Sequence, residues 1–179
     1  DYITPKESDI KDYLGFFINT AGVGVEELAL EYSNNNDEYK SIMIKIVADR
    51  MAEAFAELLH LIVRRDYWGY GKNESLELND LLSESYDGIR PAIGYPSIPD
   101  HSEIVKVFEV IGKNQSEMSV TDSFMMKPGA SVSGLYFANP KAKYFAVGKL
   151  KKDQTINYME RKGTNLDFVA KIMNHYLVE

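Results

Sequence analysis

The first half of the chain is dominated by apolar positions that recur at helical spacing. From residue 39 to residue 65 nothing interrupts this periodicity, which is typical of one face of a long helix. The opposite side also carries apolar residues, among them Ile42, Ile46 and Ala52, so we expect the helix to be covered on both sides. The predicted core face consists of Ile44, Val47, Met51, Ala54, Phe55, Leu58 and Ile62.

Beyond residue 118 the period shortens to that of strands. Three short segments rich in Val, Phe and Tyr, separated by turn residues, predict an antiparallel meander; they are residues 119–125, 131–138 and 144–150. Helical spacing returns in residues 153–162 and 165–176. The predicted fold class is therefore α+β, an antiparallel twisted sheet packed with a long helix and C-terminal helices, in one domain over residues 1–179.

Residues 90–101, RPAIGYPSIPDH, form a segment that we call the ribbon. Proline fixes φ and favours an extended conformation in the residue before it, so the three prolines predict a stiff, extended ribbon. Gly94 permits a close approach to the backbone, while Arg90 and Tyr95 offer a planar cation and an aromatic face. This suits a polar, partly aromatic ligand. A rigid connection to the next helix explains the segment equally well.

Two carboxylates on the long helix are a further candidate for a binding surface. Asp49 and Glu53 are four residues apart and are therefore neighbours on a mostly apolar face. The alternative is that both are solvated acids that pair with Lys45 or Arg50.

Tyr144 lies where the last predicted strand leaves its turn, next to Phe145. This position suits the edge of a pocket. An aromatic side chain that only pins the turn would have the same pattern.

Composition narrows the possible functions. The net charge of −7 argues against nucleic acid and anionic membranes as partners, because phosphate groups require a basic surface. There is no cysteine, and the three histidines have no metal-site spacing, so no bound metal is expected. No signal peptide or 18-residue apolar run is present, which favours the cytoplasm. Because the chain begins with Asp1 and not with Met, we interpret it as part of a longer protein.

Several motifs together resemble the C-terminal activation domain of cobalamin-dependent methionine synthase. They occur in one order along nearly the whole chain, and chance agreement of several such motifs is improbable. Besides the ribbon they comprise ADRMAEAFAE at 48–57, YWGY at 67–70, PGASVSG at 128–134, YFAVG at 144–148, DQ at 153–154 and RKG at 161–163.

The resemblance implies a module that binds S-adenosylmethionine and presents its methyl group to a cobalamin held by a neighbouring domain. In this family the reaction restores an oxidised cobalamin, with electrons from a flavodoxin-type donor. The implied partners are thus the cobalamin-binding domain of the same protein and flavodoxin. Positions matched to the family place S-adenosylmethionine against Arg90, Ala92, Gly94, Tyr95, Tyr144, Phe145 and Glu53, and Asp49 against the cobalamin domain.

The match also has a departure. The family's domain extends further on the N-terminal side, where an acidic residue is expected to contact the ammonium group of the ligand, and no segment of this chain matches it. The chain is therefore expected to be the C-terminal part of the activation domain. A docking module that caps the cobalamin domain or recruits flavodoxin, without catalysis, is the alternative function.

Overall fold

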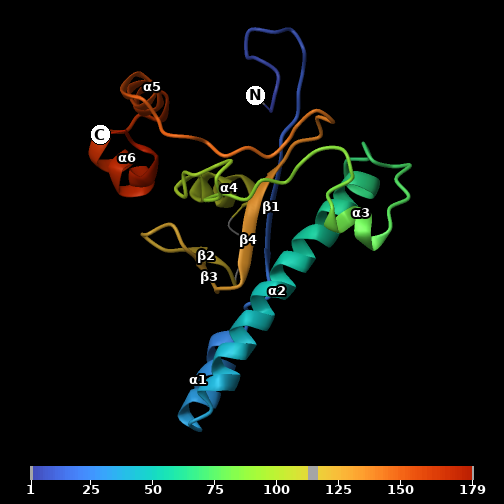
Figure 1. Ribbon diagram of the computed structural model, residues 1–179, viewed down its shortest axis with the longest axis vertical. Coiled ribbons are helices and arrows are strands. Elements are labelled where there is room, and N and C mark those ends of the chain that lie inside the picture. Colours follow the sequence, from blue (N-terminus) through green and yellow to red (C-terminus); the bar gives the residue numbers. More distant parts are fainter. Residues whose placement is uncertain (1, 113–116, 179) are drawn as a thin grey trace.

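The structure, a computed structural model, describes residues 2–112 and 117–178. A strand and two helices come first: β1 (Gly15–Thr20), α1 (Val25–Asn34) and the long α2 (Glu38–Ile62), which continues into a π-helical turn at Val63–Tyr67. Figure 1 shows α1 lying along the first half of α2, and α2 running diagonally beside the strands. The long helix predicted from residue 39 to residue 65 is thus confirmed.

The second half of the chain contains short elements joined by extended segments. They are α3 (Leu78–Leu82), α4 (Glu103–Ile111), β2 (Ser119–Val120), β3 (Met126–Lys127), β4 (Ser131–Tyr136), α5 (Lys152–Lys162), α6 (Leu166–Met173) and a 3-10 turn at Asn174–Tyr176. Helices and antiparallel strands are combined, so the predicted α+β class is confirmed.

The strand pairing differs from the predicted meander. β4 pairs with β1, from Gly15 opposite Tyr136 to Thr20 opposite Ser131, more than 110 positions away in the chain. β2 and β3 form a separate small hairpin within residues 119–127. Residues 144–149 belong to no strand. A local pattern identifies segments that suit a strand, but it carries no information on a partner so distant in sequence.

The ribbon runs along β4 on the side away from β1. Ile89 bridges Phe137 and Ala92 bridges Gly134, and the amide of Leu135 donates to the carbonyl of Pro91 at 3.1 Å. A Cβ on Gly134 would lie 2.5 Å from that carbonyl oxygen, so the absence of a side chain permits this approach.

The predicted core face of α2 is wrong. Val47, Met51, Phe55 and Leu58 are 44–60% exposed, and the buried face consists of small or polar residues four or seven positions apart. These are Ser41, Ala48, Ala52, Ala56 and His60. Small side chains let α2 lie close to the sheet, where the rings of Phe17 and Tyr136 fill the space, stacked with their centroids 4.8 Å apart. The Asn19 side chain donates to the carbonyl of Ala52 at 2.8 Å and ties β1 to the helix.

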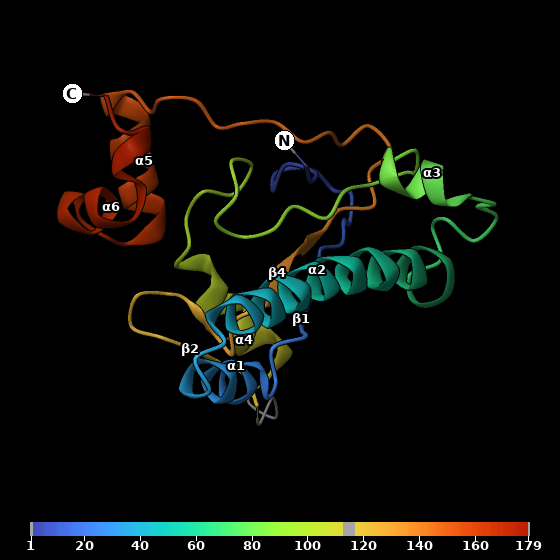
Figure 2. The same ribbon diagram turned by 60° about the horizontal axis from the view of Figure 1, so that its bottom comes forward.

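The C-terminal helices lie beside α4 at the edge of the molecule, as both ribbon views show (Figures 1 and 2). Asp100, at the end of the ribbon, accepts hydrogen bonds from Tyr158 and Lys162 of α5. Helix α5 ends at Gly163, whose φ of 68° is in the left-handed region that favours glycine. On α6, Val169 and Met173 are buried, whereas Leu166 is 54% exposed.

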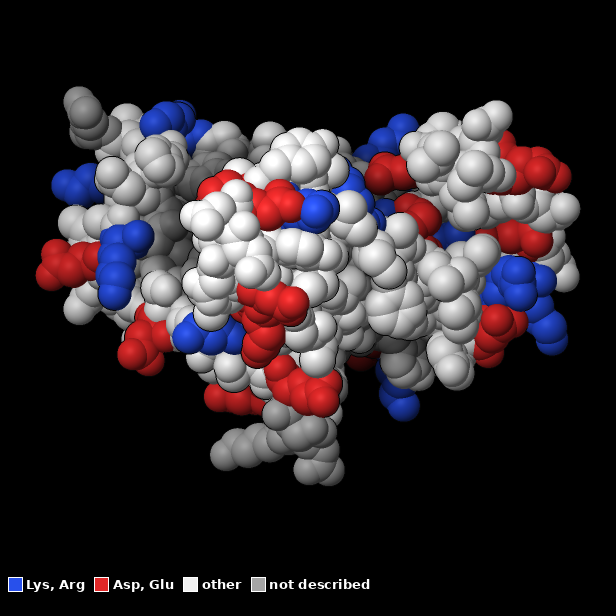
Figure 3. Space-filling view, turned by 90° about the horizontal axis from the view of Figure 1, so that it is seen from below, with Lys and Arg blue, Asp and Glu red and all other residues white. Residues whose placement is uncertain are grey.

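In the view from below (Figure 3), Lys and Arg side chains are dispersed among Asp and Glu and form no continuous basic area. None of the helices within residues 2–112 and 117–178 is both long enough and apolar enough to cross a bilayer.

The buried alanine face of α2 can be tested by enlarging it. Ala52→Leu should lower the free energy of unfolding by about 1–3 kcal/mol, because extra methylene groups in a close-packed interface force side chains apart. Ala54→Leu, on the exposed side of the same helix, should change it by less than about 0.5 kcal/mol. Urea denaturation followed by circular dichroism measures both. Equal effects of the two variants would show that the buried face has been misassigned.

Candidate functional site

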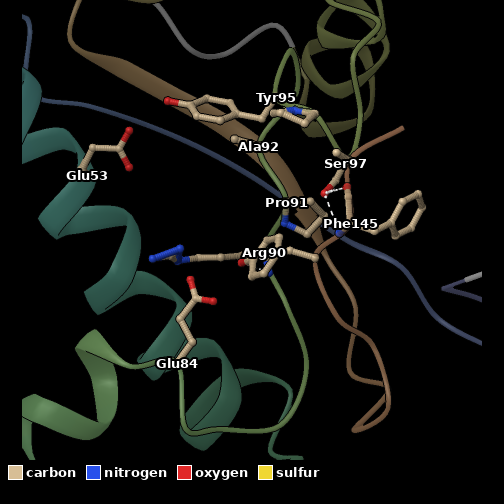
Figure 4. A pocket seen from close by; sticks show the side chains of 11 residues that line it. Glu53, Glu84, Arg90, Pro91, Ala92, Tyr95, Ser97 and Phe145 are labelled. Atoms are coloured by element: carbon tan, nitrogen blue, oxygen red, sulfur yellow. Dashed lines mark hydrogen bonds between the residues drawn. The ribbon is translucent and has the colours of Figure 1, made fainter. Parts of the chain in front are cut away.

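A cavity of about 530 Å³ lies between α2, the start of the ribbon and residues 144–146. This volume is within the range of pockets that hold small molecules, about 300–1,000 Å³. Figure 4 shows its walls. The cavity is lined by Glu53, Glu84, Arg90, Pro91, Ala92, Tyr95, Pro96, Ser97, Tyr144, Phe145 and Ala146.

Arg90 projects from the ribbon toward α2, with Glu53 and Glu84 on either side (Figure 4). Its guanidinium forms a salt bridge with Glu57, and its side chain is only 16% exposed. Burial alone would lower the pKa of Arg90, but Glu57, Tyr86, Tyr144 and Glu84 together outweigh it and raise the pKa above its usual value. The Nε of Arg90 is buried and has no hydrogen-bond partner in the described part of the chain. The guanidinium is therefore charged and retains a free donor.

Tyr144 connects two walls of the cavity. Its hydroxyl accepts a hydrogen bond from the backbone amide of Arg90 at 3.0 Å, and burial raises its pKa. The side chain thus pins the start of the ribbon and also lines the cavity, so the two interpretations of its sequence position are compatible.

Phe145 is held through its backbone. The Ser97 hydroxyl donates to the Phe145 carbonyl at 2.6 Å and accepts from the Phe145 amide at 3.3 Å. The amide of Val147 donates to the carbonyl of Pro96 at 2.8 Å. Residues 145–147 are therefore attached to the ribbon, although they form no strand.

Gly94 lies within the ribbon but not among the residues that line the cavity. Its φ is 90°, and a Cβ at this position would lie 2.3 Å from the imidazole of His101. Its amide donates to the carbonyl of Ile98 at 2.7 Å, which closes the ribbon into a turn. Gly94 therefore shapes the backbone on which Ala92 and Tyr95 reach the cavity.

The two acids of α2 occupy adjoining hollows. Glu53 lines the cavity, and a neighbouring groove continues from Glu53 and Tyr95 to Asp49. Neither acid makes a salt bridge within residues 2–112 and 117–178, and Lys45 pairs with Glu26 at 2.9 Å instead. Both acids are exposed, as the alternative of solvated acids predicts, but they do not pair with Lys45 or Arg50 in the described part of the chain. Both carboxylates remain available to a ligand or a partner.

Behind the cavity lies a buried cluster around His60. The imidazole is stacked on Tyr136 at 5.1 Å, and its Nε2 is 3.1 Å from the hydroxyl of Tyr70. Burial, together with the charges of Arg64 and Arg90, lowers the pKa of His60 to about 2. The imidazole is therefore neutral at physiological pH and acts as a packing group.

The sequence did not single out two carboxylates near Arg90. Glu84 follows a short helix in an ordinary polar segment, and only the structure shows that it lines the cavity and has a φ of 54°, which is rare outside glycine. Glu57 is partly buried on α2. Its pairing with Arg90, 33 positions away, depends on how α2 crosses the ribbon.

The arrangement defines a class of site. A buried arginine with a free donor can bind a carboxylate, and carboxylates with aromatic rings around it favour a cationic group on the same ligand. The described residues contain no group of three or more His, Asp or Glu placed to hold a metal ion. The geometry is thus that of a small-molecule pocket lined by both a cationic side chain and acidic side chains.

Comparison with known proteins gives the family. Residues 1–163 match the family described as vitamin B12 dependent methionine synthase, activation domain, and the chain belongs to it. A crystal structure described as the MetH reactivation domain bound to AdoHcy (S-adenosylhomocysteine) superimposes with a TM-score of 0.95 at 44% sequence identity. The match covers 99% of this chain and 55% of that chain, so this chain spans about half the length of the relative.

A side chain at Gly94 should disturb the ribbon. Gly94→Ala should lower the free energy of unfolding by about 1–3 kcal/mol, the usual cost of a sparsely populated backbone conformation, and the clash with His101 adds to it. Gly148→Ala is the matched control, because a Cβ there meets nothing within 4 Å. Thermal denaturation compares the two, and equal melting temperatures would contradict the role assigned to Gly94.

The buried His60 should make stability depend on pH. Its pKa is about 2 in the folded chain, against an ordinary value of 6.5. Below pH 6.5 the unfolded chain therefore binds a proton that the folded chain does not, and stability falls by up to about 1.4 kcal/mol per pH unit.

Urea denaturation between pH 7 and pH 5 measures this slope. His60→Phe keeps a ring against Tyr136 but cannot titrate, so the slope should be lost. A variant of the exposed His175, His175→Gln, should retain the slope. A His60→Phe slope equal to that of the unmodified chain would contradict the assignment.

Proposed function

We propose that the cavity beside Arg90 binds S-adenosylmethionine. The observation that carries this proposal is the charged, largely buried side chain of Arg90 in the wall of a cavity of suitable volume. The AdoHcy named for the 44% identical relative has the same amino acid and nucleoside parts as S-adenosylmethionine, which supports the choice of ligand.

The lining residues fit the parts of this ligand. The guanidinium of Arg90 suits the carboxylate, since an arginine binds a carboxylate with two parallel hydrogen bonds. The rings of Tyr95 and Tyr144 provide aromatic faces, and a cation beside such a face gains about 0.5–2 kcal/mol. Glu53 and Glu84 provide negative charge for the ammonium and the sulfonium. Glu84 in particular supplies an acidic group at a position that the sequence motifs did not indicate.

The reaction we propose for this site is methyl donation during reductive reactivation of methionine synthase. A cobalamin held by a neighbouring domain would supply the nucleophile, with a flavodoxin-type donor as the source of electrons. The leaving group is a neutral thioether, so no residue of this chain is required as a general base. Its residues hold the ligand and orient the methyl group. Asp49 lines the groove that adjoins the cavity, which supports our proposal that it contacts the cobalamin domain.

A docking module is the second candidate, and the exposed apolar side of α2 favours it. Val47, Met51 and Leu58 are each at least 45% exposed and follow one another at four- and seven-residue distances. Such a surface suits a protein partner, whether the cobalamin domain or flavodoxin. The two functions differ in whether this chain alone recognises a small molecule.

Titration calorimetry with S-adenosylmethionine separates the two functions. The unmodified chain should bind the ligand saturably, and Arg90→Ala should weaken binding about ten- to a hundredfold, the equivalent of one or two charge-assisted hydrogen bonds. Arg65→Ala removes an arginine whose side chain is 47% exposed and which does not line the cavity, so it should leave affinity unchanged. Circular dichroism confirms that each variant is folded. Absence of binding by the unmodified chain would overturn the proposal and leave the docking module.

A further inference from the structure

The carboxylate of Glu57 lies behind the cavity and has no part in the ligand contacts proposed above. It is not among the lining residues, yet it forms a salt bridge with the guanidinium of Arg90, and the two side chains are 21% and 16% exposed respectively. Glu57 is one helical turn beyond Glu53, so one face of α2 presents the first carboxylate to the cavity and the second to Arg90.

Glu57 is itself held in place. The hydroxyl of Tyr86 donates to Oε2 of Glu57 at 3.5 Å. The guanidinium of Arg64 covers the Tyr86 ring at 3.7 Å, and the imidazole of His60 meets this ring edge-on at 5.2 Å. Arg64 and His60 are completely buried. The carboxylate of Glu57 is therefore attached to a rigid cluster as well as to a helix whose buried face is fixed against the sheet.

Arg90, by contrast, is fixed at its backbone and needs a partner at its tip. Bonds to Tyr144 and along β4 hold the start of the ribbon, but an arginine side chain has several rotatable bonds beyond its Cα. In the described part of the chain, Glu57 is the residue that pairs with its guanidinium. One oxygen of Glu57 accepts a hydrogen bond from Nη2 of Arg90. The guanidinium has further N–H donors that Glu57 does not use, including the buried Nε.

We infer that Glu57 is a positioning residue, which holds the guanidinium of Arg90 in the orientation that binds the carboxylate of an S-adenosyl ligand. This inference rests on the proposed function. Glu57 acts through Arg90 and not by contact with the ligand. A bidentate bond requires one edge of the guanidinium, with two parallel N–H groups, to point at the carboxylate, so loss of Glu57 should cost recognition of that group in particular.

The experiment compares two ligands that differ in this group, S-adenosylmethionine and decarboxylated S-adenosylmethionine. The unmodified chain should prefer the carboxylate-bearing ligand by about ten- to a hundredfold. Glu57→Ala should reduce this preference nearly to that of Arg90→Ala. In the double variant of Glu57→Ala and Arg90→Ala, the preference for the carboxylate-bearing ligand should equal that of Arg90→Ala alone, because Glu57 acts through Arg90. Calorimetry gives the four pairs of dissociation constants.

Two further variants distinguish positioning from a general structural role. Glu57→Gln keeps an oxygen that accepts from the guanidinium and should restore part of the preference. Glu53→Ala removes the neighbouring carboxylate, which lines the cavity without pairing to Arg90. It should weaken both cationic ligands alike and leave their ratio unchanged. A fall in the melting temperature of Glu57→Ala with an unchanged ratio would show a purely structural role.

The outcomes separate this inference from the proposed function. If the unmodified chain binds neither ligand, the proposed function fails, and the role of Glu57 in it fails too. If the chain binds with the expected preference and Glu57→Ala leaves that preference unchanged, only the role of Glu57 is wrong. An increased preference in Glu57→Ala would also overturn the inference, because it would show that Glu57 competes with the ligand for Arg90.

Discussion

The close contact between the alanine face of α2 and the β1–β4 pair is the constraint on which the rest of the structure depends. Ala52 and Ala56 bring the helix axis near the sheet, and the Asn19 side chain fixes the helix along β1 through its bond to the Ala52 carbonyl. With larger residues the helix would lie farther away. Glu57, one position beyond Ala56, would then no longer reach Arg90.

A second close approach, between the ribbon and β4, determines the position of the other cavity wall. Gly134 lets the ribbon run against β4, where the Pro91 carbonyl accepts a hydrogen bond from Leu135. The side chain of Arg90 starts from this fixed backbone and crosses to the helix. The cavity therefore lies between α2 and the ribbon. Alanines set the position of α2 and Gly134 sets that of the ribbon, so both walls are positioned by residues with little or no side chain. Precision at the site comes from packing outside it.

The sequence predicted the type of each element better than how the elements pack and pair with one another. Element type was correct for the long helix α2 and for α5. The ribbon, predicted to be extended, instead turns at residues 93–98, where the Gly94 amide donates to the Ile98 carbonyl. The buried face of α2 was wrong, since size and hydrophobicity do not reveal that a close contact favours alanine over Met51 or Phe55. Pairing of β1 with β4, and of Glu57 with Arg90, joins positions far apart in the chain, which a local pattern cannot specify.

Charge at the cavity bears on which ligand is favoured. Arg90 and Glu57 together are neutral, so Glu53 and Glu84 leave the lining with an excess of negative charge. A ligand carboxylate that binds Arg90 adds to this excess, and a cation on the same ligand offsets it. S-adenosylmethionine carries two cationic groups, an ammonium and a sulfonium, whereas S-adenosylhomocysteine lacks the second. The acidic lining therefore favours the methylated form under the proposed function, and after methyl transfer the product retains fewer favourable contacts than the substrate had.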